Sequence, residues 1–269
     1  MARGSPRQPV SRFRWVLPPH PWNATGDVRA ATFNVRHGRP PKARRADHPR
    51  LLDAVRSLDA DVVALQELDR GTRRVGGVDQ PDLIARGTGS HVEFAMAIDH
   101  DGGEYGIALA TRSAPVRTEV LRLPGAGEPR VALLTTIEHD DGDDSPRRWT
   151  VGCTHLTTRP GEAVAQLRLV LAALAEMAGA GPAVLLGDLN LGPDRVGPVL
   201  ADAGWVAAPS GPTHPATRPD RRIDWVLVRH ATVRSAHVVD VRASDHLPLV
   251  ASLEAATPPP LMDAGERAP

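Results

Sequence analysis

The chain has 269 residues, of which 41% are hydrophobic and 24% charged, proportions that allow one sizeable globular core. Lys plus Arg and Asp plus Glu both number 32, so the formal net charge is zero and lacks the basic excess usual in nucleic-acid-binding proteins. The single cysteine, Cys153, excludes an internal disulfide and any multi-cysteine zinc site.

The two ends of the sequence differ in composition from the middle. Residues 1–27 are rich in Arg, with prolines at 6, 9, 18, 19 and 21, and predict an irregular arm. A second Pro-rich, polar stretch over 257–269 predicts a flexible tail, so the domain is expected to cover 28–256. The sequence has no apolar run of about 18 residues and no signal-peptide pattern, so we expect no membrane span, a cytoplasmic location and a monomer.

Strand-like and helix-like segments alternate within the predicted domain. Apolar residues at helical spacing predict helices over 49–58, 161–177 and 193–203. The acidic stretch 139–145 predicts a hairpin loop. Strands are predicted over 28–35, 61–66, 92–98, 105–111, 116–123, 130–138, 148–155, 183–186, 223–228, 233–239 and 247–253. Because many strands follow one another without a helix between them, we expect an α/β fold with two packed sheets and helices on their flanks.

Polar residues interrupt or follow several of these apolar strands. Asn34 lies inside the first strand, and Glu67 follows the apolar run of the second. Taken alone, Asn34 also fits an edge or turn position, and Glu67 also fits a solvated carboxylate at the rim of the sheet. Asp188 and Asn190 follow Gly187 at a spacing of two, which directs both side chains the same way, although an ordinary strand-to-helix turn favours the same residues.

Further polar residues lie at the ends or starts of later strands. His155 ends a strand, Asp224 begins one, and Asp245 and His246 come just before another. A lone histidine at a strand end is more often structural than catalytic. If the strands run antiparallel, however, residues at the ends of some strands and the starts of others meet at one rim, and all these side chains converge there.

The chemistry of this residue set indicates the kind of ion that it would bind. Carboxylate and amide oxygens suit hard cations such as Mg²⁺, Mn²⁺ or Ca²⁺. The sequence contains no His-Glu-x-x-His motif, which disfavours zinc, and no glycine-rich phosphate loop of the Walker or dinucleotide-binding type.

Six short motifs, in order from Thr-Phe-Asn-Val at 32–35 to Ser-Asp-His-Leu-Pro at 244–248, resemble those of the endonuclease/exonuclease/phosphatase superfamily, also called the deoxyribonuclease I-like fold. The four between them are Leu-Gln-Glu-Leu, Cys-Thr-His-Leu, Gly-Asp-Leu-Asn and Arg-Ile-Asp-Trp. Gly-Gly-Glu-Tyr-Gly at 102–106 and Glu-Pro-Arg at 128–130 resemble compact bacterial members. The resemblance implies a four-layer sandwich of two mixed, mostly antiparallel sheets flanked by helices.

The resemblance also implies a set of metal ligands. Glu67 is expected to be the principal ligand of Mg²⁺ or Mn²⁺, with Asn34 beside it and Asp245 completing or orienting the metal shell. The metal would offset charge on the phosphoryl group and on the departing oxygen.

Roles in catalysis follow from the same resemblance. His246 is expected to act as general base on the attacking water or to contact the scissile phosphate, with Asp224 fixing its tautomer. Asp188 and Asn190 are expected to position the water, the phosphate or a second metal. His155 is expected to contact the phosphate oxygens or to assist the leaving group.

Three further residues are candidates for substrate contact or for support of the site: Glu104, Tyr105 and Arg130. Glu104 is a candidate partner for His155, and Arg130 is expected to be a structural partner. Three positions depart from the family pattern. Ile107 and Thr111 replace the usual Asn and Ser, and His214 stands where Phe is common in a Thr-Phe-Pro stretch.

The sequence thus predicts an enzyme, a metal-dependent hydrolase of phosphate esters. Zero net charge and few aromatic residues favour a small-molecule or lipid-headgroup substrate, either a phosphodiester or a phosphomonoester. A DNA or RNA nuclease using the same residues is the alternative, and a catalytically inactive binding module is a third hypothesis. The fold alone does not choose among them.

Overall fold

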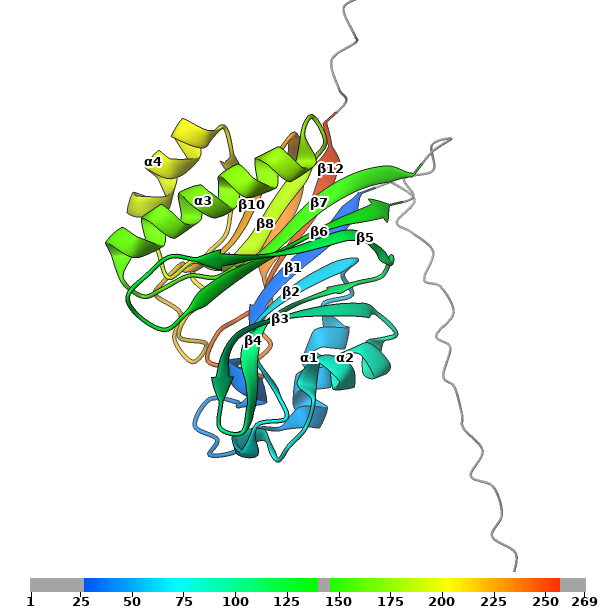
Figure 1. Ribbon diagram of the computed structural model, residues 1–269, viewed down its shortest axis with the longest axis vertical. Coiled ribbons are helices and arrows are strands. Elements are labelled where there is room, and N and C mark those ends of the chain that lie inside the picture. Colours follow the sequence, from blue (N-terminus) through cyan, green and yellow to red (C-terminus); the bar gives the residue numbers. More distant parts are fainter. Residues whose placement is uncertain (1–26, 140–145, 257–269) are drawn as a thin grey trace, which may run out of the picture.

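The computed structural model describes residues 27–139 and 146–256. The predicted C-terminal tail and nearly all of the predicted N-terminal arm and of the loop over 139–145 lie outside these residues, so their structure and the domain boundaries stay predictions. The described part forms a sandwich in which two sheets pack face to face, as expected (Figure 1).

The first sheet has the strand order β11-β12-β1-β2-β4-β3. Only β1 and β2 pair in parallel within it, and its other neighbours are antiparallel. In chain order its strands are β1 (Val28–Asn34), β2 (Val62–Arg70), β3 (His91–His100), β4 (Gly103–Thr111), β11 (Ala231–Val238) and β12 (Leu249–Ala255).

The second sheet has the order β5-β6-β7-β8-β10-β9, with one parallel pair, β7 and β8. In chain order its strands are β5 (Pro115–Leu123), β6 (Arg130–His139), β7 (Arg147–His155), β8 (Ala183–Asp188), β9 (Val206–Ala207) and β10 (Asp224–Arg229). Both sheets are therefore mixed and mostly antiparallel, which confirms the predicted fold class.

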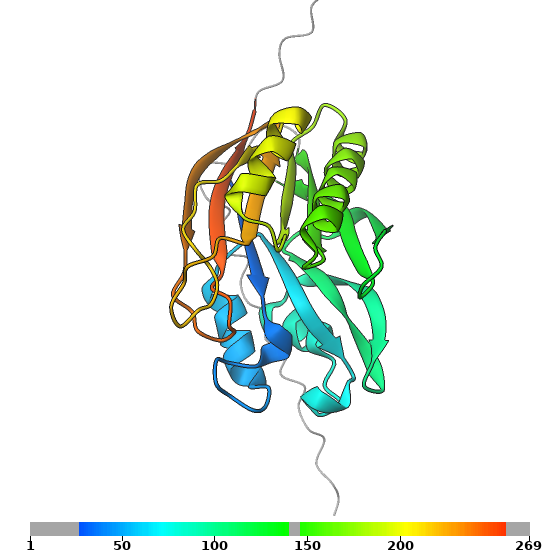
Figure 2. The ribbon, with the colours of Figure 1, turned by 90° about the vertical axis from the view of Figure 1, so that its left-hand side faces the viewer.

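Helices cover the two outer faces of the sandwich. α1 (His48–Ser57) and α2 (Gln80–Thr88) lie on the first sheet, and α3 (Pro160–Ala178) and α4 (Pro193–Ala203) lie on the second (Figures 1 and 2). Two short 3-10 helices, η1 (Arg36–Gly38) and η2 (Arg73–Val75), follow β1 and β2. The apolar core accordingly has three parts, one between the sheets and one beneath each helix pair. None of the helices in the described ranges is long and apolar enough to cross a membrane.

The predicted elements omit α2 and β9. For α2 the signals are present in the sequence: Asp79 caps the helix by accepting a hydrogen bond from the Asp82 backbone N–H at 3.0 Å, Pro81 occupies its first turn, and Gly89 ends it in a left-handed conformation. The helix is only nine residues long, and its few apolar positions hide its period. β9 has two residues, too few for a pattern.

The functional end of the sandwich is a polar continuation of the core between the sheets. In each of the strands named below, every second side chain faces that core. At one end of each strand, the last of these inward-facing side chains is polar. These inward series are 30, 32 and 34 in β1, 151, 153 and 155 in β7, 184, 186 and 188 in β8, 228, 226 and 224 in β10, and 109, 107 and 105 in β4. Because these strands all present that end to one rim, their polar residues meet there.

Candidate active site

The residues expected to converge do lie together at this rim. In the second sheet, β7, β8 and β10 are adjacent, and their register pairs His155 with Asp188 and Asp188 with Asp224. Directly paired residues on neighbouring strands have their side chains on the same face. Asp188 therefore has His155 on one side and Asp224 on the other, and all three are buried.

Asn34 joins the two sheets at the site. Its side-chain Nδ2 donates to Glu67 Oε1 at 2.9 Å and to Asp188 Oδ2 at 3.0 Å. Its Oδ1 accepts the backbone N–H of Arg36 at 3.1 Å. Nδ2 thereby spaces the two carboxylates. The amide oxygen keeps a second lone pair, so the expectation that Asn34 helps to bind a metal stays a prediction.

A β-bulge places Glu67 in the site. The pairing of β2 with β4 shifts between Gln66 and Leu68, both buried, and Glu67 takes a left-handed φ of 60°. A bulge residue of this kind turns its side chain out of the regular alternation. Burial raises the pKa of Glu67, against the effect of the Asn34 hydrogen bond. The carboxylate is thus held in a position where its negative charge is poorly solvated.

Asp188 is the centre of the hydrogen-bonded cluster. Besides Asn34, it lies 3.6 Å from His155 Nε2 and 3.8 Å from His246 Nε2, measured to its Oδ2, and its Oδ1 accepts the backbone N–H of Asn190 at 3.0 Å. Burial, followed by the charge of Asp224, raises the pKa of Asp188 to about 7. A carboxylate with this pKa can take up a proton near neutral pH.

His246 and Asp224 form a buried pair beside Asp188. His246 Nδ1 lies 2.9 Å from Asp224 Oδ2, which also accepts the Thr213 hydroxyl. Burial alone would lower the pKa of His246, but Asp224, Asp188 and then Asp245 outweigh it and raise it to about 10. His246 is therefore an imidazolium at neutral pH in the metal-free protein, and its Nε2–H is a charged donor.

His155, unlike His246, is a neutral imidazole. An arginine guanidinium can only donate, so the 2.9 Å contact from Arg130 Nη1 makes His155 Nδ1 an acceptor and leaves the proton on Nε2. Burial, with the positive charges of Arg130 and His246, lowers the pKa of His155 well below its ordinary value. His155 thus presents a neutral N–H donor, and Arg130 holds it through this contact. The expectation that Arg130 has a structural role stays a prediction.

Asp245 and Asn190 lie at the edges of this cluster. Asp245 Oδ2 pairs with Arg36 Nε at 3.3 Å, and Oδ1 accepts the Ser244 hydroxyl at 3.2 Å. Asn190 has a left-handed φ of 52°, and its Nδ2 donates to the Leu156 carbonyl at 3.0 Å. Asp245 keeps about a third of its side chain exposed (30%), so this carboxylate is accessible from solvent.

The donor set fits a hard divalent cation. Glu67, Asp188, Asp224 and Asp245 bring carboxylate oxygens to one rim, and Asp224 Oδ1 is buried without a hydrogen-bond partner. Atoms of Asp188, Asp224 and His246 lie within 4.8 Å of one another, a spacing that could also hold an ion. That compactness reflects the hydrogen bond between His246 and Asp224, however. Carboxylate oxygens such as those of Glu67 and Asp245 are the kind of ligand that Mg²⁺ prefers.

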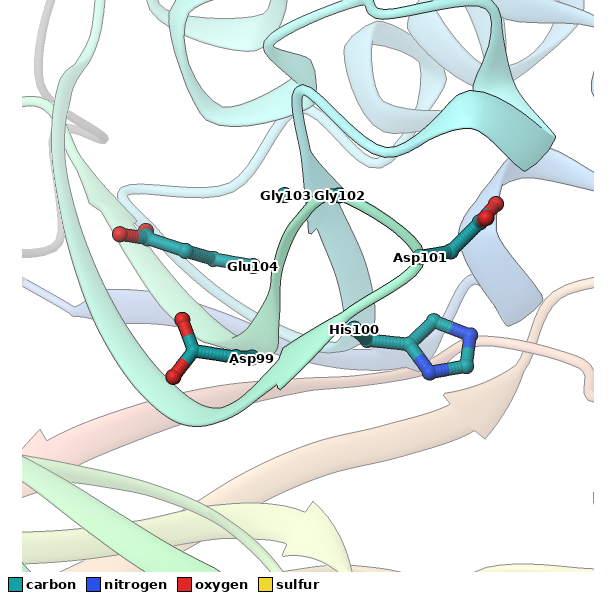
Figure 3. Close-up of a pocket in the computed structure, with 6 residues that line it drawn as sticks. All are labelled: Asp99, His100, Asp101, Gly102, Gly103 and Glu104. Carbon is teal, nitrogen blue, oxygen red and sulfur yellow. The ribbon is translucent and has the colours of Figure 1, made fainter.

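Glu104 takes a different place from the one expected, whereas Tyr105 lies at the site, where it lines the same small hollow as Arg130 and His155. Glu104 pairs with Arg70, whereas His155 is bonded to Arg130, so the expected pairing of Glu104 with His155 is wrong. Glu104 lines a shallow hollow at the β3–β4 turn, where its side chain points away from His100 and Asp101 (Figure 3). The hollow contains none of the partners of Asp188. Tyr105 is buried, and burial followed by the charge of Glu67 raises its pKa, so it remains an un-ionised phenol.

Three contacts at the site were not predicted. Arg36 pairs with Asp245, Thr213 bonds Asp224, and the His214 ring packs on the His246 ring with centroids 4.5 Å apart. Only His214 had a visible signal, its departure from the family pattern. The other two depend on loops whose paths the strand pattern does not fix.

These features define a class of protein: a two-sheet sandwich with buried carboxylates and histidines gathered at one rim. The sequence model of the Endonuclease/Exonuclease/phosphatase family matches residues 31–246, which include nearly all of the domain. The chain belongs to this family. Its members are typically hydrolases of phosphate esters, usually with divalent metals, so membership supports a phosphoesterase or nuclease type of hydrolysis.

Relatives and solved structures agree with this assignment. The chain is 26% identical to the uncharacterized protein YbhP of Escherichia coli K12 over 246 residues, which cover 84% of this chain and 95% of YbhP. It is similar to the structure of an endonuclease/exonuclease/phosphatase from Beutenbergia cavernae, with TM-score 0.71, 27% identity and coverage of 87% and 72%. The fold is also that of D. rerio TDP2 complexed with a single-strand DNA product, with TM-score 0.64, 17% identity and coverage of 85% and 99%.

Proposed function

We propose that this protein is a divalent-metal-dependent phosphoesterase that hydrolyses a phosphodiester or phosphomonoester of a small molecule or lipid headgroup by in-line attack of water. One observation carries the proposal. The Asp188 carboxylate lies among the side-chain nitrogens of Asn34, His155 and His246, at 3.0, 3.6 and 3.8 Å. A basic carboxylate surrounded by N–H donors can accept a proton from water while the donors hold phosphoryl oxygens.

The proposed metal is Mg²⁺ or Mn²⁺, held by Glu67 and Asp245. A bound divalent ion would offset the negative charge of the phosphoryl group and of the departing oxygen. It would also relieve the unfavourable burial of the Glu67 carboxylate. Asn34, the further metal residue expected from the sequence, would fix the position of Glu67 through Nδ2.

The structure supports a division of work among the titratable side chains. Asp188, whose pKa is raised to about 7, suits the removal of a proton from the attacking water. The backbone N–H of Asn190 donates to the Asp188 carboxylate and orients it. His246, whose pKa is raised to about 10, suits donation to a phosphoryl oxygen. Of the two roles expected for His246, general base or phosphate contact, we therefore propose the second. His155 would donate to another phosphate oxygen or to the leaving group.

The substrate class rests on charge and on the small number of aromatic residues. The formal net charge is zero, and only 3% of residues are aromatic, so base stacking has few candidates. Nucleic acid remains the alternative substrate to be tested, because the likeness to TDP2 is one of fold. The predictions of a cytoplasmic location and a monomeric state stay predictions.

A substrate panel with and without metal tests the proposal. The purified protein is assayed on bis-p-nitrophenyl phosphate, p-nitrophenyl phosphate, a phospholipid with a phosphodiester headgroup and plasmid DNA, each with Mg²⁺, Mn²⁺ or EDTA. We expect hydrolysis of a small ester or the lipid that EDTA abolishes. Activity that survives chelation would refute the metal, and plasmid nicking faster than small-ester turnover would reverse the order of substrates.

Two substitutions test the site itself. Asp188→Ala and His246→Ala should each lower hydrolysis by roughly a thousandfold or more while the protein still folds. Asp53→Ala is the matched control, because its carboxylate is exposed on α1. Near-wild-type rates in either site variant would break the assignment, and an inactive wild-type protein on all substrates would favour the binding-module hypothesis.

A further inference from the structure

The segment 213–222 forms a tight hairpin against the catalytic cluster. The backbone N–H groups of Thr213 and His214 both donate to the Arg221 carbonyl, at 2.9 and 3.1 Å, and the Arg221 N–H donates back to the His214 carbonyl at 2.9 Å. The Thr213 hydroxyl donates to Asp224, the partner of His246. The backbone N–H and carbonyl of His214 are thus both held by hydrogen bonds, and the residue before it, Thr213, contacts the site directly.

The side chains of His214 and Arg221 pair across this hairpin. Arg221 Nη2 lies 2.5 Å from His214 Nδ1. Because arginine only donates, His214 Nδ1 is an acceptor and its ring proton lies on Nε2. This is the arrangement that Arg130 imposes on His155. Within the described ranges, no hydrogen bond uses His214 Nε2, so a free N–H donor is available there.

The His214 ring also lies against the ring that is proposed to contact phosphate. The centroids of His214 and His246 are 4.5 Å apart, with the ring planes tilted by 57°. His214 is only partly buried and Arg221 is exposed, so a ligand can reach both from solvent. Two imidazoles with N–H donors and one guanidinium therefore line the same side of the site.

We propose that His214 and Arg221 form an additional anion-binding subsite that takes a non-bridging oxygen of the substrate's phosphate group. His214 binds the oxygen through Nε2–H, and Arg221 is a positioning residue that holds the proton on Nε2. The subsite rests on the proposed function, since a phosphate ester is its ligand. A purely structural role for His214, as an aromatic ring packed on His246, would require no nitrogen.

His214→Phe separates the two roles, because it keeps a flat ring on His246 and removes the N–H. Binding of inorganic phosphate to the metal-free protein is measured by calorimetry, and hydrolysis of bis-p-nitrophenyl phosphate is measured with Mg²⁺. We expect the Kd for phosphate and the kcat/KM each to worsen about tenfold or more, which is the scale of one hydrogen bond to a charged group. His91→Phe, exposed at the far end of β3, is the control and should bind phosphate like wild type.

Arg221→Gln tests the positioning role. ¹⁵N NMR of the His214 ring should show Nε2–H alone in wild type and a mixture of tautomers in the variant, with Arg221→Lys restoring part of the phosphate affinity. Arg86→Gln, an exposed arginine on α2, should change neither. The subsite is overturned if wild type does not bind phosphate or if His214→Phe binds it as well as wild type. Phosphate binding that weakens in His214→Phe, in a wild-type protein that hydrolyses none of the panel, would uphold the subsite and refute the proposed phosphoesterase.

Discussion

His246 donates through Nδ1 to Asp224 at 2.9 Å, and both side chains are buried. The pair is held from the other side by Thr213, whose hydroxyl donates to the same oxygen of Asp224. A carboxylate in this geometry stabilises the charged form of the histidine ring and so offsets the cost of burying that charge. Asp224 therefore controls the protonation state of the residue that is proposed to contact phosphate.

Asp224→Asn removes that control. The pKa of His246, raised to about 10 when burial is outweighed by Asp224 and its neighbours, should fall towards or below its ordinary value of 6.5. At pH 8 the ring then changes from imidazolium to neutral imidazole, and kcat should fall roughly a hundredfold or more. Titration of the His246 ring by NMR in the metal-free protein measures the pKa directly. An unchanged His246 pKa in this variant would contradict the assignment.

Glu67→Gln should raise the stability of the metal-free protein but remove the stabilisation that Mg²⁺ gives to wild type. Burial raises the pKa of Glu67, so its ionised form is disfavoured in the fold at neutral pH. Without a metal, the neutral Gln side chain should therefore raise the melting temperature by a few degrees. With Mg²⁺ the order should reverse, because only wild type gains the metal. Thermal unfolding in EDTA and in Mg²⁺ tests this, and an equal Mg²⁺ shift in both proteins would exclude Glu67 as a ligand.

Much of this site could be predicted from the sequence because its residues end or begin apolar strands. Asp188 and His155 each end a run of buried residues. Because β7 and β8 run parallel with these two residues opposite each other, both side chains reach one rim, and the period of two puts them on the same face. Glu67 follows such a run too, but its bulge is invisible in a pattern of alternating side chains. Gly106 of β4 pairs with Leu68 just after this bulge, and its missing side chain leaves room for the β3 backbone on its other side.

The residues that sequence could not place lie in loops or depend on hydrogen-bond direction. Arg36 and Thr213 touch Asp245 and Asp224 through loop paths that no periodicity fixes. Asn34 was placed correctly at the rim, but which of its amide atoms faces Glu67 depends on the backbone N–H of Arg36, a tertiary contact. Residue type and strand position therefore predict the place of a side chain well. They predict less well which of its atoms donate or accept hydrogen bonds.

Asp188 should make the metal-free protein sensitive to pH. Its pKa is raised from 3.8 to about 7, so its protonated form is the one favoured in the fold. The corresponding stability is fully present below pH 3.8 and is lost as the pH rises to 7. Asp188→Asn should remove this decline and melt at a higher temperature than wild type at pH 7. Urea unfolding at pH 5 and pH 7 in EDTA measures it, and identical pH dependence in both proteins would refute the raised pKa.

Gly187 links the fold to the chemistry, since it precedes Asp188 on β8. A Cβ at this position would collide with the Thr154 backbone carbonyl of β7, which is rigid because it belongs to the sheet. Gly187→Ala should therefore cost about 1–3 kcal/mol of stability and displace Asp188, lowering kcat by roughly tenfold or more. Gly161→Ala is the matched control. Gly161 is exposed in the first turn of α3, and apart from its chain neighbours and the helix backbone no atom lies within 4 Å of its added Cβ, so the same change should not lower stability and should leave hydrolysis unchanged. Chemical denaturation and kcat measured on both variants distinguish the outcomes, and a Gly187→Ala protein as stable and active as wild type would show that β7 and β8 need no close approach at this point.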